Sequence, residues 1–378
     1  MSRTAEIAGN NIKYHVMDPT GNITILVETP VAEASQPFVA AKLMELEPEV
    51  EQVGFLTLAE TPEPDRSGCL QQEMASQPEK TQQSEKIPLA ESSQNKYDIA
   101  LRMAGGEFCG NATMSAAAFY AEKNGLKEGT VVVRVSGAEK PVPVEISRLD
   151  GEEGGRSSFK GIVAMPPAQS ISEVYLPVQK PDTFADEQER SKSNTQAGVR
   201  KSRDGIGFQS QPEAESGRET GIEAKKCTVV HFEGIDHVIL EGSPDRKLAE
   251  ALAPVWCRAL QADAIGLMFL ERLPSGEQNI LQNGMLTPLV YVPEAGTLVW
   301  ENSCASGTSA VGVWAADVLK RQEIMEDTAK ADKGKSFRKR STFPQKGCLH
   351  LQEPGGILSV RVSPDGEIRL EGVVRERV

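Results

Sequence analysis

The chain has 378 residues, of which 39% are hydrophobic and 25% charged, and its formal net charge at pH 7 is −13. This length accommodates two domains with sizeable cores, and the acidic balance argues against a nucleic-acid partner. No membrane association is expected, because the sequence contains no run of about 18 apolar residues. The first residues also lack the apolar core of a signal peptide, so the expected compartment is the cytoplasm.

The first half is expected to consist of strands with two helices. Strands are predicted for TILVETP from Thr24 and EQVGFLTL from Glu51, because both are rich in β-branched and apolar residues. A short helix over FVAAKLMELEPE separates them and ends before Pro48. The strand YDIALRM leads to a helix over residues 112–124, which Gly125 is suited to end. The strands TVVVRVSG, VPVEISRL and FKGIVAM follow.

The second half repeats this pattern of several strands around a helix. CTVVHFEGIDHVILEG is predicted to form strands, and LAEALAPVWCRALQA has the spacing of an amphipathic helix. The strands AIGLMFLERL and LTPLVYVPE precede a helix through VGVWAADVLKRQ. LSVRVSPDGEIRLEGVVRERV closes the chain as a hairpin with Pro-Asp-Gly at its turn. The order of elements predicts an α+β fold with mainly antiparallel strands.

Three polar tracts interrupt this order, at about residues 61–95, 180–225 and 326–346. The first is rich in Gln, Ser, Glu and Pro and nearly free of large apolar residues. Such a composition buries too little apolar surface to fold by itself. We interpret the first two tracts as polar insertions and the third as a loop.

The cysteines and histidines are spaced too irregularly for a disulfide framework or a zinc site. None of the six cysteines forms a C-x-x-C pair, and the four histidines do not cluster with them. No metal is therefore expected. Four of the cysteines are interpreted as small buried hydrophobic residues, namely Cys69, Cys227, Cys257 and Cys348.

The other two cysteines lie in stretches that resemble each other, GGEFCGNATMSAAAFYA around Cys109 and VWENSCASGTSAVGVWAA around Cys304. In each, an acidic residue precedes the cysteine, small residues follow it, and an Ala-rich run comes next. Thr113 and Thr308 occupy the same place relative to the cysteine. Either cysteine alone would also fit a buried structural role. Their repetition favours two facing halves that each supply one thiol to a shared site.

Two opposed thiols suit the removal of a proton from one face of a carbon and its return to the other. A thiolate acts as the base and a thiol as the acid, and their roles exchange for the opposite enantiomer, so no cofactor such as pyridoxal phosphate is needed. The predicted helix starts would bind an α-carboxylate through their free amides and lower the pKa of each thiol. These amides belong to Gly110, Asn111, Ala305 and Ser306.

The motifs resemble those of the diaminopimelate epimerase superfamily, which includes proline racemases and other cofactor-independent amino-acid racemases. The Cys-Gly-Asn at Cys109 is similar to the first catalytic motif of that superfamily, and SCASGTSA around Cys304 is similar to the second. GNITILV, EQVGFL and GIDHVIL are similar to further segments of the family. This resemblance implies substrate contacts for Asn22, Gln52 and His237.

The resemblance also implies two similar lobes, each a mixed, mainly antiparallel barrel-like sheet around a central helix, with the site in the cleft between them. The N-terminal lobe would span residues 1–127 with a closing strand at 369–378, and the C-terminal lobe residues 128–368. Cys109 and Cys304 would be the acid–base pair. A family glutamate near the substrate amino group matches either Glu294, by spacing, or Glu301, by closeness to the thiol. The family tends to form homodimers, so a homodimer is expected.

Departures from the family pattern bear on the substrate, expected to be a small amino acid. Ala295 and Asn302 stand where an arginine would hold the distal carboxylate of diaminopimelate, and Ile235 replaces an asparagine of the same subsite. Loss of a bidentate arginine is a substantial change. Histidine racemases that supply opine-type metallophores belong to this superfamily and have a similar EFCGNAT-like motif. A histidine racemase is therefore the leading hypothesis.

Other functions also fit parts of the pattern. A diaminopimelate epimerase with a rebuilt distal site is the alternative enzyme, whereas the two cysteines argue against a phenazine-type isomerase. A non-catalytic amino-acid-binding protein on the same fold is the alternative from a different class. Structural roles fit single residues as well: a core position for His237, turns for Asn22 and Glu294, and a capping or solvated carboxylate for Glu107.

Overall fold

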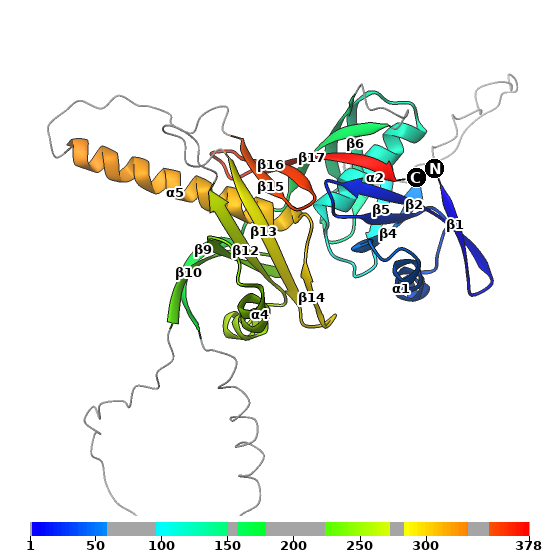
Figure 1. Ribbon diagram of the computed structural model, residues 1–378. Coiled ribbons are helices and arrows are strands. Elements are labelled where there is room, and N and C mark those ends of the chain that lie inside the picture. The colour runs from blue at the N-terminus through cyan, green and yellow to red at the C-terminus, as the bar shows by residue number, and fades with distance from the viewer. Residues whose placement is uncertain are drawn as a thin grey trace, which may run out of the picture. The chain divides into compact units, whose positions relative to one another are not determined.

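The computed structural model describes residues 2–58, 96–149, 157–178, 224–272, 283–331 and 348–377 (Figure 1), with only the backbone of residues 322–331. The predicted insertion at 61–95 lies outside the described residues, as does that at 180–225 apart from its last two residues. Two compact units are present. The first comprises the described residues of Met1–Pro167, Pro274–Gly284 and Glu301–Val378, and the second those of Ala168–Leu273 and Met285–Trp300.

Eight strands of the first unit close into a mixed barrel. In order around the barrel they are β2 (Asn10–Pro19), β3 (Thr24–Val27), β4 (Gln52–Leu58), β5 (Ile99–Met103), β6 (Glu128–Val135), β7 (Val142–Leu149), β8 (Ser158–Met165) and β17 (Ile368–Arg377). The last strand of the chain pairs with both β8 and β2, which closes the ring. The pairs β3–β4 and β5–β6 are parallel and the others antiparallel. The predicted α+β class and a barrel-like sheet are thus confirmed for this unit.

Helix α2 (Gly110–Lys123) runs inside the barrel (Figure 1) and packs on β2, β3, β5, β6, β7, β8 and β17. Every residue from Gly110 to Phe119 is buried. A helix enclosed on all sides must be small and apolar all round, and the Ala-rich sequence of this segment meets that need. Asn124 caps its C-terminus and Gly125 follows with a φ of 68°, which confirms the predicted stop.

Further elements of the first unit extend the barrel. They are β1 (Arg3–Ile7), the 3-10 turn η1 (Glu33–Ser35), α1 (Gln36–Leu46), α5 (Ala305–Ala331), β15 (Leu349–Glu353) and β16 (Gly356–Val362). α1 covers a core that includes the fully buried Ile25 and Leu43. β15, β16 and β17 form an antiparallel meander, which confirms the predicted closing hairpin, and α5 packs on β16 and β17.

The third polar tract is not entirely a loop, because α5 continues to Ala331. The sequence offers a reason for the difference. Residues 323–331 contain no Gly or Pro and consist largely of good helix formers, so nothing ends the helix where the composition turns polar. Residues 332–346 lie outside the described residues.

The second unit combines strands with one amphipathic helix. It contains β9 (Ser170–Pro177), β10 (Ala224–Phe232), β11 (Ile235–Glu241), α4 (Arg246–Leu260), β12 (Ile265–Arg272), most of β13 (Asn283–Val292) and β14 (Thr297–Trp300). β9, β10 and β11 are antiparallel neighbours, whereas β11 and β12 are parallel and joined through α4. The Asp245 side chain caps α4, and Trp256 anchors the helix by donating to the Pro177 carbonyl oxygen at 2.8 Å.

The predicted helices and most predicted strands are confirmed, and four α-helices occur in the described residues. The division into lobes at residues 1–127 and 128–368 stays a prediction, as does the likeness between two lobes. Within the described part of the chain, no helix combines the length and apolar character that crossing a membrane requires.

Candidate active site

Cys109 is the N-cap residue of α2. Its extended backbone turns its sulfur toward the helix, so that the Ala112 amide donates to Sγ at 3.4 Å. The Gln52 side chain, at the start of β4, also hydrogen-bonds the thiol. Burial raises the pKa of the Cys109 thiol to about 12, although these two hydrogen bonds oppose the increase.

Cys304 stands in the same position before α5. The Gly307 amide donates to its Sγ at 3.3 Å, as Ala112 does to Cys109. The backbone amides of Thr308 and Thr113 close the first turn onto the cysteine carbonyl oxygens at 2.8 and 2.9 Å. The sequence repeat is therefore a structural repeat, in which each thiol caps a helix.

The predicted lowering of the thiol pKa by the helix ends is wrong for this structure. Burial raises the pKa of Cys304 well above its ordinary value, and the charges of Glu301 and Glu353 raise it further. Loss of hydration disfavours a thiolate more strongly than one or two amide hydrogen bonds favour it. A positive charge placed beside either thiol would therefore favour its ionisation.

The two helix starts lie against each other. The buried Asn111 amide nitrogen donates to the Ser303 carbonyl oxygen at 3.4 Å and to its hydroxyl at 3.3 Å. A Cβ on Gly110 would come within 3.2 Å of the Ala305 Cβ. First-turn amides have no acceptor in their own helix and carry the positive end of its dipole. Two such ends in contact suit a carboxylate.

Glu301 brings negative charge to the same place. It accepts a hydrogen bond from the Cys304 thiol, and its charge raises the pKa of both Cys304 and Cys109. Burial raises the pKa of Glu301 itself to about 7, with a further contribution from Glu51. This carboxyl group is thus within electrostatic reach of both thiols.

Glu51 links three segments of the chain. Its two oxygens accept from the Asn22 amide at 2.6 Å and the Asn302 amide at 2.7 Å, and Asn22 in turn accepts from Gln52. Burial raises the pKa of Glu51. Sequence reasoning selected its neighbour Gln52 but missed Glu51, although the two are adjacent in EQVGFL.

Glu353, at the end of β15, is a second residue that sequence reasoning missed. It is 1% exposed and accepts the backbone amide of Cys304 at 2.7 Å and the hydroxyl of Thr308. Burial raises its pKa to about 8, and nearby Glu301 and Glu51 add to the increase. No local pattern marks this position, because LQEPGG reads as an ordinary hairpin turn.

The described contacts around the thiols thus join positive helix ends with carboxyl groups. The helix ends suit an α-carboxylate and the carboxyl groups suit an ammonium group, so the arrangement is complementary to an amino-acid zwitterion. In the described part of the chain no three His, Cys, Asp or Glu residues are placed to hold a metal ion.

The candidate residues divide between the two units. The first unit brings together Asn22, Gln52, Cys109, Gly110, Asn111, Glu301, Cys304, Ala305 and Ser306, with the Ser306 hydroxyl 3.6 Å from the Cys304 sulfur. His237 and Glu294 belong to the second unit. His237 lies in β11 with no exposed surface, and burial lowers its pKa to about 3. Glu294 is exposed in the turn between β13 and β14.

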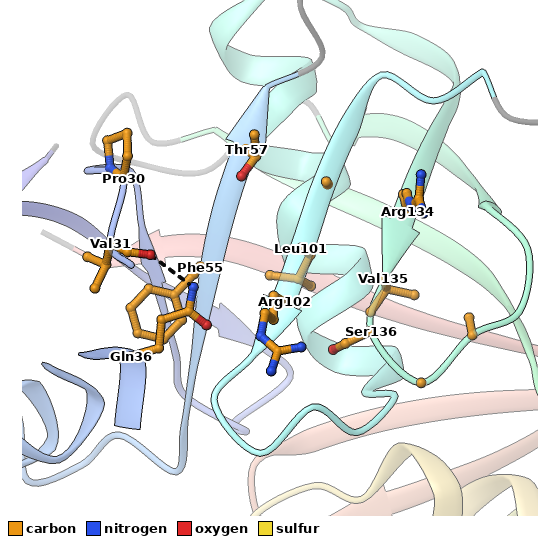
Figure 2. A pocket seen from close by; sticks show the side chains of 13 residues that line it. Pro30, Val31, Gln36, Phe55, Thr57, Leu101, Arg102, Arg134, Val135 and Ser136 are labelled. Atoms are coloured by element: carbon orange, nitrogen blue, oxygen red, sulfur yellow. Dashed lines mark hydrogen bonds between the residues drawn. The ribbon is translucent and has the colours of Figure 1, made fainter. Parts of the chain in front are cut away.

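A separate pocket of about 420 Å³ lies in the first unit beside β4 and β5 (Figure 2). Phe55, Arg102 and Ser136 are among its lining residues, which include neither cysteine motif. The Ser136 hydroxyl accepts the Met103 amide and donates to the Glu107 carbonyl oxygen, both at 2.9 Å. One wall of this pocket therefore supports the loop that leads to the first cysteine motif.

A mixed barrel closed around a helix that begins at a cysteine, beside a second such helix, fits the class of proteins the resemblance indicated. Residues 82–185 and 209–332, more than half of the chain, match the family described as "Histidine racemase CntK N-terminal domain". The chain belongs to the histidine racemase CntK family, which confirms the predicted family.

Curated relatives agree with this membership. A histidine racemase of Staphylococcus aureus (strain Mu50) is 24% identical over 310 residues, which cover 80% of this chain and 79% of that protein. A histidine racemase of Fusobacterium nucleatum (strain ATCC 25586) is 25% identical over 223 residues, which cover 57% of this chain. The chain spans 62% of the length of the Fusobacterium protein.

Proposed function

We propose that this chain is a racemase of a free amino acid, with histidine as its substrate, and that Cys109 and Cys304 act as the acid–base pair at Cα without a cofactor. The observation that carries the proposal is the repeated geometry of the two thiols. Each caps a helix in the same way, and the two helix starts are in contact. Histidine as substrate rests on the family and on the relatives, which are histidine racemases.

The chemistry requires one proton to leave and one to arrive. The thiolate of one cysteine takes the Cα proton, and the electron pair left on Cα spreads into the α-carboxylate. The amides of the helix starts stabilise the charge that develops there. The thiol of the other cysteine then donates its proton to the opposite face of Cα. The pair ends with its protonation states exchanged and is ready for the reverse reaction.

The raised thiol pKa values fit a base that forms when substrate binds. Carboxyl groups near the two thiols oppose their ionisation, most directly Glu301. An ammonium group placed beside Glu301 would counter that charge and favour a thiolate. In this proposal Asn22, Gln52 and either Glu301 or Glu294 contact substrate, as does His237.

The test is incorporation of deuterium at Cα from D₂O, measured for histidine, diaminopimelate and a panel of other L-amino acids. We expect exchange and racemisation with histidine. Cys109→Ala and Cys304→Ala should each lower the rate of racemisation by about 1,000-fold or more, because one face of Cα is then left without a group that can take or donate a proton. Cys227→Ala, a buried thiol of the second unit, is the matched control and should retain activity.

The alternative functions give different results in the same experiment. Exchange with diaminopimelate alone would establish an epimerase and overturn histidine as the substrate. Binding of an amino acid without exchange would favour a binding protein. Activity that survives both cysteine substitutions would overturn the two-thiol mechanism. A role in opine metallophore supply and a homodimer stay predictions.

A further inference from the structure

The hairpin of β15 and β16 is fastened to the segment before α5 at two points. The Glu353 carboxyl accepts the Cys304 backbone amide at 2.7 Å, and the Gly355 amide donates to the Asn302 carbonyl oxygen at 2.8 Å. Gly355 also packs so closely on Gly21 that a Cβ there would lie 2.5 Å from the Gly21 Cα. The backbone that carries the second thiol is therefore held by the hairpin as well as by its own helix.

The two helix starts differ at this point. In the first, the Thr113 hydroxyl donates to the Cys109 carbonyl oxygen at 2.6 Å. In the second, the equivalent Thr308 hydroxyl donates to Glu353 instead. A repeat that is otherwise closely matched has thus acquired a buried carboxyl group at one thiol.

A carboxyl group is costly to bury unless hydrogen bonds satisfy it. Each Glu353 oxygen has a partner, and both partners belong to the start of α5. Breaking this arrangement would leave the Cys304 amide buried without an acceptor, which disfavours the present backbone conformation. The position of the Cys304 sulfur depends on that conformation.

We propose that Glu353 is a positioning residue for Cys304, which fixes the backbone of the second thiol and brings a carboxyl group beside it, so that the two thiols of the repeat are not equivalent. This inference rests on the proposed function, because it assigns Cys304 a part in the reaction. Glu353 itself does not contact the reacting atoms. Glu301 also acts on this thiol and on Glu353, and Glu51 acts on Glu353.

Two substitutions separate the hydrogen bonds from the charge. Glu353→Gln keeps an oxygen that can accept the Cys304 amide but removes the charge. Glu353→Leu removes both. Glu367→Gln, in the exposed turn between β16 and β17, is the matched control. It removes a carboxylate that forms an ion pair with Arg369.

The first measurement needs no substrate. Alkylation of Cys304 and Cys109 by iodoacetamide is followed by peptide mass spectrometry across pH 6–10, with Cys109 as the internal standard. Loss of a neighbouring negative charge lowers a thiol pKa. Burial raises the pKa of Glu353 to about 8, so its negative charge is present only above that pH. In Glu353→Gln we therefore expect alkylation of Cys304 to become about tenfold faster at a fixed pH above 8 and below the pKa of the thiol. Cys109 should react as in the wild type, and Glu367→Gln should change neither thiol.

The second measurement is the rate of Cα exchange with histidine. Misplacing a reacting group by a small distance costs about 100-fold in rate, so Glu353→Leu should lower kcat by about that factor and leave KM nearly unchanged. Glu353→Gln should recover kcat to within about tenfold of the wild type, because the amide acceptor is restored.

The outcomes decide the proposal in each case. A folded Glu353→Leu variant with wild-type kcat would overturn the positioning role. If that variant does not fold, an unchanged alkylation profile of Cys304 in Glu353→Gln overturns the proposal and the expected acceleration supports it. A wild-type chain that exchanges no amino acid would refute the proposed function, while the alkylation comparison would still decide the effect of Glu353 on Cys304.

Discussion

At the scale of single residues, Glu301 and Glu353 show what sequence reasoning can and cannot find. Glu301 is a candidate because it lies close to Cys304 in the sequence, and in the structure it accepts a hydrogen bond from that thiol. Glu353 comes from a distant hairpin and Glu51 from the residue before β4, so their approach to the site depends on chain pairing that no local pattern encodes. A motif reveals the residues that share its segment, and the tertiary fold supplies the others.

Substitution of Glu301 and of Glu294 distinguishes which of these two glutamates contacts the substrate amino group. Glu301→Gln should raise KM for histidine by about 10- to 100-fold, since a hydrogen bond between charged groups contributes about 1.5–3 kcal/mol. It should also make Cys304 easier to alkylate, because Glu301 raises the pKa of that thiol. Steady-state kinetics and alkylation rates measure the two effects. Glu294→Gln is the comparison. If Glu294→Gln raises KM and Glu301→Gln does not, the assignment belongs to Glu294.

At the scale of elements, strongly patterned segments were predictable, whereas several strands with a weaker pattern were not. The enclosed helix α2, the amphipathic α4 and the final hairpin were all expected. The opening hairpin of β1 and β2 was missed because its turn does not show an Asn-Gly or Asp-Gly pair. Its turn residues Ala8 and Gly9 have φ angles of 51° and 77°, and alanine in such a conformation is uncommon.

The element-scale prediction concerns the contact between two turns, at Gly21 and Gly355. A Cβ on Gly21 would lie 2.3 Å from the Gly355 Cα, and the φ of Gly21 is 96°. Gly21→Ala should therefore combine backbone strain with overpacking and lower the free energy of unfolding by about 3 kcal/mol. Urea denaturation measures the change, and a loss of racemase activity should accompany it because both turns adjoin the segment before Cys304.

Gly366→Ala is a control that tests backbone strain without overpacking. Its φ of 91° is close to that of Gly21, but nothing lies within 4 Å of the position its Cβ would take. Gly366→Ala should cost about 1 kcal/mol and leave activity intact. Equal losses in the two variants would show that the close approach of the turns is unimportant.

At the scale of the whole molecule, the sequence predicted the class of fold more readily than its closure. Predominantly antiparallel strands followed from the order of elements. Closure of the eight-stranded barrel requires β17, from the end of the chain, to lie between β8 and β2. Such pairing across the whole sequence leaves no local signal, and the expectation of a closing strand came from family resemblance. The buried carboxyl groups of this unit were equally invisible in composition, although they affect the stability of the entire fold.

Stability should depend on pH through these groups. Burial raises the pKa of Glu353 to about 8 and that of Glu301 to about 7, above the value of an unfolded glutamate, so the folded chain binds more protons from about pH 4.5 upward. The free energy of unfolding should therefore fall as pH rises from about 5 to 8, by about 1.4 kcal/mol per pH unit for each group that titrates. Urea denaturation at a series of pH values measures this slope.

In acid solution the free energy of unfolding should change with pH in the opposite direction. Burial favours the neutral form of Glu28, but hydrogen bonds from Lys123, Lys13 and His15 outweigh it and lower the pKa of Glu28 to about 2. Its contribution is present above about pH 4.5 and is lost as pH falls toward 2. The folded chain should thus be most stable in mildly acidic solution. Glu353→Gln should reduce the fall in the free energy of unfolding between pH 6 and 8. It should leave the loss of stability below about pH 4.5 unchanged, because Glu28 lies in a separate ion-pair network. A wild-type chain whose stability increases from pH 5 to 8 would contradict the burial of these carboxyl groups.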